Sequence, residues 1–330
     1  MYMHYMYMNL LSMLIVIIFV MMGVAFLTLL ERKLLGYIQD RKGPNKVGVL
    51  GIFQPFSDAI KLFSKEVFLI MKISKKLFFL MPILSILILM MLWMTYVYNT
   101  NIYFLNYSIL IMVMFLSLNS YMIMMMGWSS NSLYSMIGSI RLIAQVLSYE
   151  VSFIIIMLVQ LILSESYSLI DFIKWQYFMW FMWMMIPLVM IFFISILAEL
   201  NRSPMDFIEG ESELVSGFNV EYFSGSFALI FMSEYGMIIF MSYLLNYMYM
   251  GLNNEIGNFI MINVMVLMII YMRGILPRMR YDELMYLCWK IILPLILNYL
   301  LFMMYFKINF CVCVYKFMEN FKFLYYVFKT

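Results

Sequence analysis

Long apolar runs separated by short polar segments cover most of the chain. A helix needs about 20 apolar residues to cross the ~30 Å hydrocarbon core of a bilayer. Hydropathy predicts eight such helices, over residues 10–30, 77–98, 105–128, 138–163, 176–200, 222–247, 257–275 and 284–306. Lipid offers no hydrogen-bond partner to open backbone, so these segments must be helical. The pattern predicts an all-α polytopic membrane protein with a single transmembrane domain over residues 1–306.

The first long polar segment contains an amphipathic helix. In GIFQPFSDAIKLFSKE, residues 51–66, helical spacing separates an apolar face from a polar one. The apolar face carries Phe53, Phe56, Ile60 and Phe63, and the polar face carries Gln54, Asp58, Lys61 and Lys65. A helix of this type is expected to lie in the membrane interface.

Basic residues predict the orientation of the chain. The segment from Glu31 to Lys76 holds ten of the 21 Lys and Arg residues. With eight spans, four further bases fall on the same side: Arg202, Arg273, Arg278 and Arg280. The positive-inside tendency places this side in the compartment where the protein is made, and both termini opposite it. The bases of RKGPNKVG, residues 41–48, fit this topological role or the docking of an extramembrane subunit.

The last 24 residues, 307–330, form an amphiphilic tail. Its apolar stretch, residues 308–315, is too short to span a bilayer. We expect the tail to lie along the membrane surface or against an accessory subunit.

Composition narrows the class further. Hydrophobic residues make up 66% of the chain and charged residues 12%, which excludes a soluble protein and gives no reason to expect a nucleic-acid partner. Forty Met, 30 Phe and 26 Tyr suit a very AT-rich genome that reads ATA as Met. This coding bias predicts a mitochondrial gene and a protein of the inner membrane.

Cysteine and histidine are too sparse to predict a redox centre. Cys288, Cys311 and Cys313 lack the paired spacing of a zinc or iron–sulfur site, and the single histidine, His4, precedes the first span. We expect no metal or haem here, so any redox chemistry must come from a partner or a diffusible carrier.

Acidic residues gather in one stretch, AELNRSPMDFIEGESELVSGFNVEY, residues 198–222. It holds one base, Arg202, and six carboxylates: Glu199, Asp206, Glu209, Glu211, Glu213 and Glu221. Several interacting carboxylates titrate as a group and can pass protons without any one of them staying ionised in an apolar region. A solvated acidic loop explains the central acids equally well.

Two further acids, Glu150 and Glu234, lie inside predicted spans, where a carboxylate is costly unless it is protonated, paired or hydrated. At 100° per residue, Glu150 lies about 180° from Arg141 on its helix. Its own helix therefore does not neutralise Glu150, which must face another helix or water, or hold a proton. The alternative is a single structural hydrogen bond between helices.

Five segments together resemble a known family. They are LLERKLLGYIQDRKGPNKVG, QPFSDAIKLFSKE, RLIAQVLSYEV, the acidic stretch above and RMRYDELMYLCWK. They occur in the same order in the chain 1 family of mitochondrial NADH:ubiquinone oxidoreductase, respiratory complex I, and the resemblance runs from about Phe26 to Pro294. Met205, where the family usually has Phe, and the pair Phe207–Ile208 depart from the family pattern.

The resemblance implies a membrane-arm subunit beside the quinone site, with the basic loop on the matrix side. It implies ubiquinone as substrate, with FMN and iron–sulfur clusters held by hydrophilic-arm partners, and with neighbouring small membrane subunits and lipid as further partners. An apolar passage for the quinone tail is expected along the first, fifth and sixth spans, although ordinary packing explains such side chains equally well.

The resemblance also assigns residues to roles. It places Arg32, Asp58, Arg202, Asp206 and Phe218 at the quinone chamber or its entrance. It assigns proton coupling to Glu150, Glu199, Glu209, Glu211, Glu213, Glu221 and Glu234. Of these, Glu150 and Glu234 would continue the acidic funnel into the bilayer.

Three other functions remain in view. An independent antiporter would be expected to carry a lysine or paired acid at a broken helix near the midplane, whereas only Lys290 lies any distance inside a span. A membrane subunit of a hydrogenase-type complex would share the acidic funnel without the quinone. A scaffold would make the acids incidental.

Overall fold

The computed structural model describes residues 2–67, 71–98, 105–177, 179–206, 217–252 and 254–309. Over these ranges the chain is built of helices and contains no strand. The helices are α1 (Tyr2–Ile38), α2 (Gln54–Ser64), α3 (Lys75–Leu92), α4 (Ser108–Ser130), α5 (Leu133–Ser164), α6 (Leu169–Trp175), α7 (Phe181–Met184), α8 (Ile186–Glu199), α10 (Ser224–Tyr249), α11 (Glu255–Ile275) and α12 (Tyr281–Tyr286). Short 3-10 turns are η1 (Val49–Gly51), η2 (Trp93–Thr95) and η3 (Gly217–Glu221), and η4 (Leu287–Ile292) is a π-helical turn.

Seven helices in the described residues are long and apolar enough to cross a membrane. They are α1, α3 with η2, α4, α5, α10, α11 and the continuous helix Tyr281–Asn309, which includes α12 and η4. The prediction of an all-α polytopic membrane protein is confirmed.

The predicted fifth span, residues 176–200, is not one continuous helix. The chain forms α7, leaves helical geometry at Met185, and then forms α8 with 14 residues. At 1.5 Å per residue, α8 covers about 21 Å, less than the thickness of the hydrocarbon core. Pro187 in the first turn of α8 lacks the backbone N–H that would continue a helix from α7.

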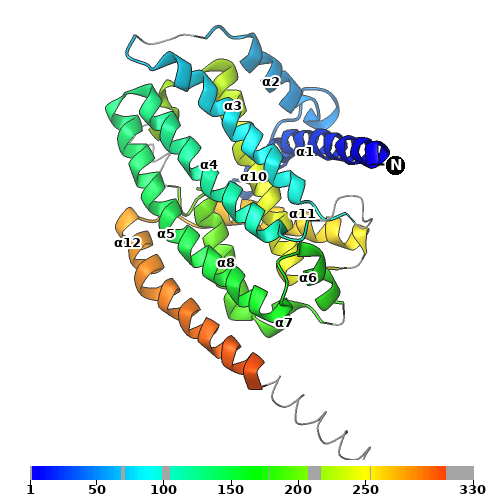
Figure 1. Ribbon diagram of the computed structural model, residues 1–330. Coiled ribbons are helices and arrows are strands. Elements are labelled where there is room, and N and C mark those ends of the chain that lie inside the picture. Colours follow the sequence, from blue (N-terminus) through cyan, green and yellow to red (C-terminus); the bar gives the residue numbers. More distant parts are fainter. Residues whose placement is uncertain are drawn as a thin grey trace, which may run out of the picture.

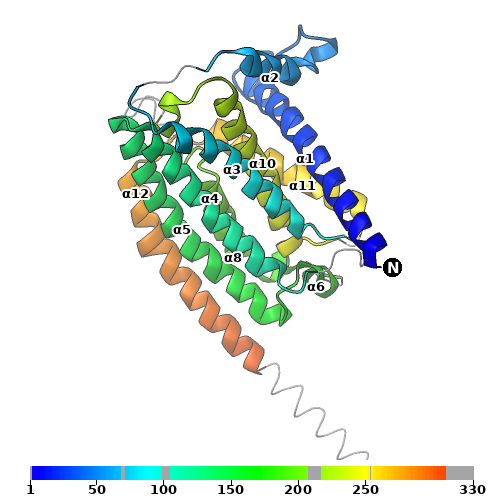
Figure 2. The same ribbon diagram turned by 45° about the horizontal axis from the view of Figure 1, so that its top comes forward.

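The centre of the bundle is α10. In its most apolar window 67% of the residues are buried, compared with 17% in α1 and 17% in the final helix. Figures 1 and 2 show α1 on one flank and the final helix on the other, with α3, α4, α5 and α8 between them. Close approach helps this packing, because a Cβ on Gly236 of α10 would lie 2.2 Å from a methyl of Leu89 in α3.

The final helix packs along α5 (Figure 1). The hydroxyl of Tyr149 in α5 donates to the carbonyl oxygen of Leu284 at 3.2 Å, and the thiol of Cys288 donates to the carbonyl of Ser148 at 3.3 Å. At the far end, Lys307 pairs with Glu165 at 2.6 Å. The helix runs on to Asn309, so the predicted tail joins it without a break, and residues 310–330 lie outside the described residues.

The predicted amphipathic helix is α2. Its Phe56 ring meets the Phe26 ring of α1 edge to face, with centroids 6.1 Å apart. Its other apolar side chains, Ile60 and Phe63, are largely exposed. That exposed face has the character expected of a helix lying in the membrane interface.

Candidate functional site: a charged cavity

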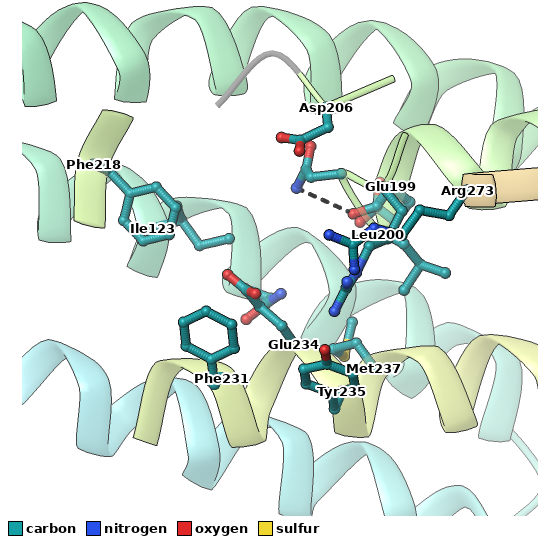
Figure 3. A pocket seen from close by; sticks show the side chains of 13 residues that line it. Ile123, Glu199, Leu200, Asp206, Phe218, Phe231, Glu234, Tyr235, Met237 and Arg273 are labelled. Atoms are coloured by element: carbon teal, nitrogen blue, oxygen red, sulfur yellow. Dashed lines mark hydrogen bonds between the residues drawn. The ribbon is translucent and has the colours of Figure 1, made fainter. Parts of the chain in front are cut away.

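A cavity of about 190 Å³ lies where α4, α8, α10 and α11 meet the loop after α8. Its lining includes Glu199, Asp206 and Glu234 among the acids and Arg202 and Arg273 among the bases. Figure 3 shows Glu234 rising from α10 toward the side that carries Glu199 and Asp206, with Phe218 and Ile123 at one edge. Two acids of the acidic stretch and one of the span acids therefore line the same cavity.

The loop after α8 is held in place by a residue on α5. Asn201, with φ at 51°, ends α8 in the left-handed region, which suits asparagine. Gln145 is fully buried, and its amide nitrogen donates to the carbonyls of Ala198 at 3.0 Å and Met205 at 2.8 Å. One side chain thus ties together both ends of the segment that presents Glu199, Arg202 and Asp206.

A buried carboxylate joins three segments beside the cavity. Arg202 donates to Glu31 Oε1 at 3.2 Å, and Arg273 of α11 donates to the same oxygen. The Glu31 side chain is 5% exposed and that of Arg202 12%. Two charges removed from water in this way remain stable only when paired in good geometry. The two arginines therefore stabilise the buried charge of Glu31, and Glu31 provides their counter-charge.

Arg202 also lies over the ring of Tyr235, with its guanidinium carbon 4.5 Å from the ring centroid. Burial acts to lower the pKa of Arg202, but the neighbouring carboxylates of Glu31 and Glu234 and the Tyr235 hydroxyl raise it above its ordinary value. Arg202 therefore stays charged and supplies fixed positive charge to the cavity. A cation over an aromatic face gains further stabilisation where water is excluded.

The remaining acids lie around this fixed charge. Asp206 pairs with Arg278 at 3.3 Å. Glu150 of α5 does not line the cavity but is close enough to Glu199 for their charges to interact. Glu150, Glu199 and Glu234 are all partly buried, so none points fully outward. Of the alternatives that the wheel argument left open for Glu150, another helix, water or a held proton, the structure shows a neighbouring helix, α8, which carries Glu199.

Of the other predicted residues, one lines the charged cavity and three lie outside its lining. Phe218 lines the cavity, and Glu221 ends η3 outside its lining. Arg32 and Asp58 pair at 2.6 Å at the corner of α1 and α2, also outside the lining. Glu209, Glu211 and Glu213 lie outside the described residues.

Sequence reasoning missed the partners that balance the acids. Glu31 and Tyr235 were not predicted as site residues, and Arg273 and Arg278 were used only for topology. Glu31 follows directly on the first apolar run and Arg273 lies near the end of the seventh span. An acid and a base at the ends of two apolar runs were therefore a usable signal, but their pairing depends on how α1 and α11 pack.

A second, apolar cavity of about 490 Å³ lies between α1, α10 and α11 near η2. Its lining is almost entirely aliphatic and aromatic, and includes Phe19, Gly23, Phe26, Trp93 and Tyr243. The first and sixth predicted spans contribute to it, and the predicted fifth span does not. The seventh predicted span, residues 257–275, lines the cavity instead, through residues such as Phe259 and Val266.

No group of three His, Cys, Asp or Glu side chains that could hold a metal ion occurs in the described part of the chain. Amide and carboxylate groups around the charged cavity suit water, protons and polar ligands.

Comparison with known proteins places this arrangement in a family. The family model described as NADH dehydrogenase matches residues 11–304. The chain is 48% identical over 301 residues to the NADH-ubiquinone oxidoreductase chain 1 of Aedes aegypti, covering 91% of this chain and 96% of that protein.

The chain belongs to the NADH dehydrogenase family. Proteins of the same name from Locusta migratoria and Lampetra fluviatilis are 46% and 44% identical, over 91% and 86% of this chain and 96% and 91% of theirs. The predicted resemblance to the complex I chain 1 family is thereby confirmed. As a NADH dehydrogenase family member with seven long apolar helices in its described residues, the chain is a multi-pass membrane protein.

Proposed function

We propose that this chain is the membrane subunit of mitochondrial NADH:ubiquinone oxidoreductase that forms part of the ubiquinone chamber and couples quinone reduction to proton translocation. Relatives at 44–48% identity bear the name NADH-ubiquinone oxidoreductase chain 1, which supports the substrate and the assembly. The inner mitochondrial membrane is the proposed location, with the basic segment between α1 and α3 on the matrix side.

The redox centres belong to partner subunits in this proposal. FMN and iron–sulfur clusters in the hydrophilic arm deliver electrons to ubiquinone beside this chain, and small membrane subunits and lipid cover the flanks. The large exposed apolar surfaces of α1 and the final helix support such cover. The names of the relatives favour a quinone reductase over a hydrogenase-type complex.

The quinone headgroup is assigned to the charged end of the bundle. Arg202, Asp206 and Phe218 offer a cation, a carboxylate and an aromatic face around one cavity. Arg32 and Asp58, paired at 2.6 Å between α1 and α2, would stand at the entrance. The apolar cavity between α1, α10 and α11 has the wall chemistry that an isoprenoid tail requires.

The acids supply the coupling. Reduction of ubiquinone to ubiquinol takes up two electrons and two protons, so the local demand for protons rises at the chamber. Carboxylates that interact through space share protons and respond as a group. Glu199 interacts with Glu150 and shares the cavity with Glu234, which supports a relay of these three toward the bilayer interior. Glu209, Glu211, Glu213 and Glu221 are proposed to extend the group toward the chamber.

An independent antiporter gains no support from the broken helix. The residues around the break, Phe181–Ile186, are all apolar, and Glu199 lies at the opposite end of α8. A carrier that used the break would need a polar or charged group there.

The observation that carries the proposal is the cavity that places Glu199, Glu234 and Asp206 beside the fixed charges of Arg202 and Arg273. Affinity purification through a tag on this chain tests the assignment. We expect a large flavin-containing assembly with NADH:ubiquinone reductase activity. A solitary chain that exchanges cations without NADH would overturn it.

A further inference from the structure

We propose that Asn119, on α4, is a positioning residue that holds water between the carboxylates of the charged cavity. The inference rests on the proposed coupling function and extends the proton path to a helix that contributes no acid. Asn119 and Ile123, one turn apart, are the α4 side chains that line the cavity.

The position of Asn119 is unfavourable without a polar partner. Eleven residues of α4 precede it and eleven follow, because α4 runs from Ser108 to Ser130. At 1.5 Å per residue it lies about 16 Å from either end, at the middle of a helix that is long and apolar enough to cross a membrane. A polar side chain at that depth is expected to face the bundle interior or water, and Asn119 faces the cavity that Glu199 and Glu234 share.

Other asparagines within the spans donate their side-chain amides to protein groups. Asn263 of α11 donates to the Phe259 carbonyl at 2.8 Å, and Asn246 of α10 donates to Asn258 at 3.2 Å. Within the described residues the Asn119 side chain makes no hydrogen bond to protein. Its two donors and its acceptor are therefore available to the contents of the cavity.

Water is the ligand that fits. A water needs about 10–15 Å³ of accessible space and two to four polar partners, and this cavity of about 190 Å³ has a carboxylate or arginine on several walls. An amide can accept from one water and donate to the next, and it does not ionise near neutral pH. A proton that enters the chain of water from Glu199 can therefore leave to Glu234, and Asn119 keeps no charge.

The test compares four variants in the complete membrane-bound oxidoreductase. Asn119→Leu conserves approximate volume and removes the amide, and Asn119→Ser keeps a donor and an acceptor. Ser120→Ala is the matched control, because this neighbouring hydroxyl donates to the Ser117 carbonyl at 2.7 Å and does not line the cavity. Glu234→Gln reports on the proposed function itself. NADH:ubiquinone turnover, its solvent deuterium isotope effect and NADH:ferricyanide turnover are measured for each.

Loss of a water-mediated contact in the rate-limiting path is expected to lower quinone turnover of Asn119→Leu about tenfold. The isotope effect should rise, ferricyanide turnover should not change, and Asn119→Ser should restore most of the rate. A merely structural role would leave the isotope effect unchanged, and that result would overturn the inference. Should Asn119→Leu fail to assemble, Asn119→Ser is compared with Asn119→Ala; equal turnover and isotope effects in that pair would overturn it too.

The reference variant separates two failures. Normal behaviour of Asn119→Leu beside a slow Glu234→Gln removes Asn119 from the path and leaves the proposed function intact. Normal quinone turnover and a normal isotope effect in both variants removes the proposed function as well.

Discussion

Glu31 on α1 and Arg202 in the loop after α8 form a buried ion pair, 3.2 Å apart, between residues separated by 171 positions in the chain. Arg273 of α11 binds the same carboxylate oxygen. Three segments that hydropathy treats as independent are thus joined at one atom. Glu31 thereby links Arg202 and Arg273, two residues that line the charged cavity.

Replacing Glu31 by Gln should destabilise the subunit strongly, because two partly buried arginines would lose their counter-charge. Removing one partner of a buried pair costs about 3–5 kcal/mol. The midpoint of thermal unfolding of the assembled complex measures the effect. Asp171→Asn is the control, since its partner Lys174, 2.8 Å away, is 67% exposed and a solvent-accessible pair is worth about 1 kcal/mol or less. Equal losses in the two variants would contradict the central place given to Glu31.

Hydropathy was sufficient to locate the apolar helices but not their ends. The first span was predicted at 10–30, whereas α1 extends from Tyr2 to Ile38. Its helical geometry continues past Glu31 into residues that are no longer part of the apolar run. The predicted span 176–200 differs from the structure for another reason, because the chain forms two helices, α7 and α8, in place of one. Average hydropathy does not register the break at Met185 or the proline that follows it.

The candidate site was predictable only in part. Helical periodicity indicated that Arg141, on the same helix, does not neutralise Glu150. In the structure, Glu199 of α8 is close enough to interact with Glu150. The pairing of Glu31 with Arg202 and Arg273 required the packing of three segments, which no local pattern encodes. Arg32 and Asp58 pair with each other rather than lining the charged cavity.

Gln145→Leu should displace the loop that carries Arg202. The change leaves the Met205 carbonyl without its side-chain donor, at about 1–3 kcal/mol for a buried group, whereas the Ala198 carbonyl still accepts from the Asn201 backbone N–H at 3.3 Å. Gln160→Leu is a matched control on the same helix, because Gln160 is fully buried and its amide makes no hydrogen bond in the described structure. Thermal unfolding should show a large loss for position 145 and little or none for position 160. The reverse order would show that Gln145 does not hold the loop.

Filling the apolar cavity should hinder long-tailed quinones selectively. Gly23 lines it, and a Cβ there would meet Ile239 at 3.5 Å, so Gly23→Leu places its remaining bulk in the open space. We expect the KM for a long-chain ubiquinone to rise several-fold while that for a short-chain analogue changes little. Leu14→Phe adds bulk to the exposed face of α1 outside the cavity and should alter neither value. An equal rise in KM for both quinones would contradict the placement of the isoprenoid tail in this cavity.

Gly127→Ala should separate α4 from α5. An added Cβ would lie 2.4 Å from Ser139 Cβ and 2.9 Å from the Ser135 carbonyl oxygen, neither of which can yield without backbone movement. Overpacking of this kind costs about 1–3 kcal/mol. At Gly225, in the first turn of α10, a Cβ would meet only the Phe63 ring at an ordinary 3.6 Å. Gly225→Ala should therefore keep the yield of assembled complex that Gly127→Ala loses; similar yields would contradict the close approach of α4 and α5.

The most direct measurement of the coupling role is the number of protons translocated per electron in proteoliposomes that contain the complete oxidoreductase with Glu199→Gln. The control is Glu165→Gln, an exposed acid at the far end of α5 that pairs with Lys307. Glu199→Gln is expected to lower proton translocation or coupled quinone turnover several-fold while NADH:ferricyanide turnover stays normal, and Glu165→Gln should behave as wild type. Full proton translocation at full quinone turnover in Glu199→Gln would contradict the account.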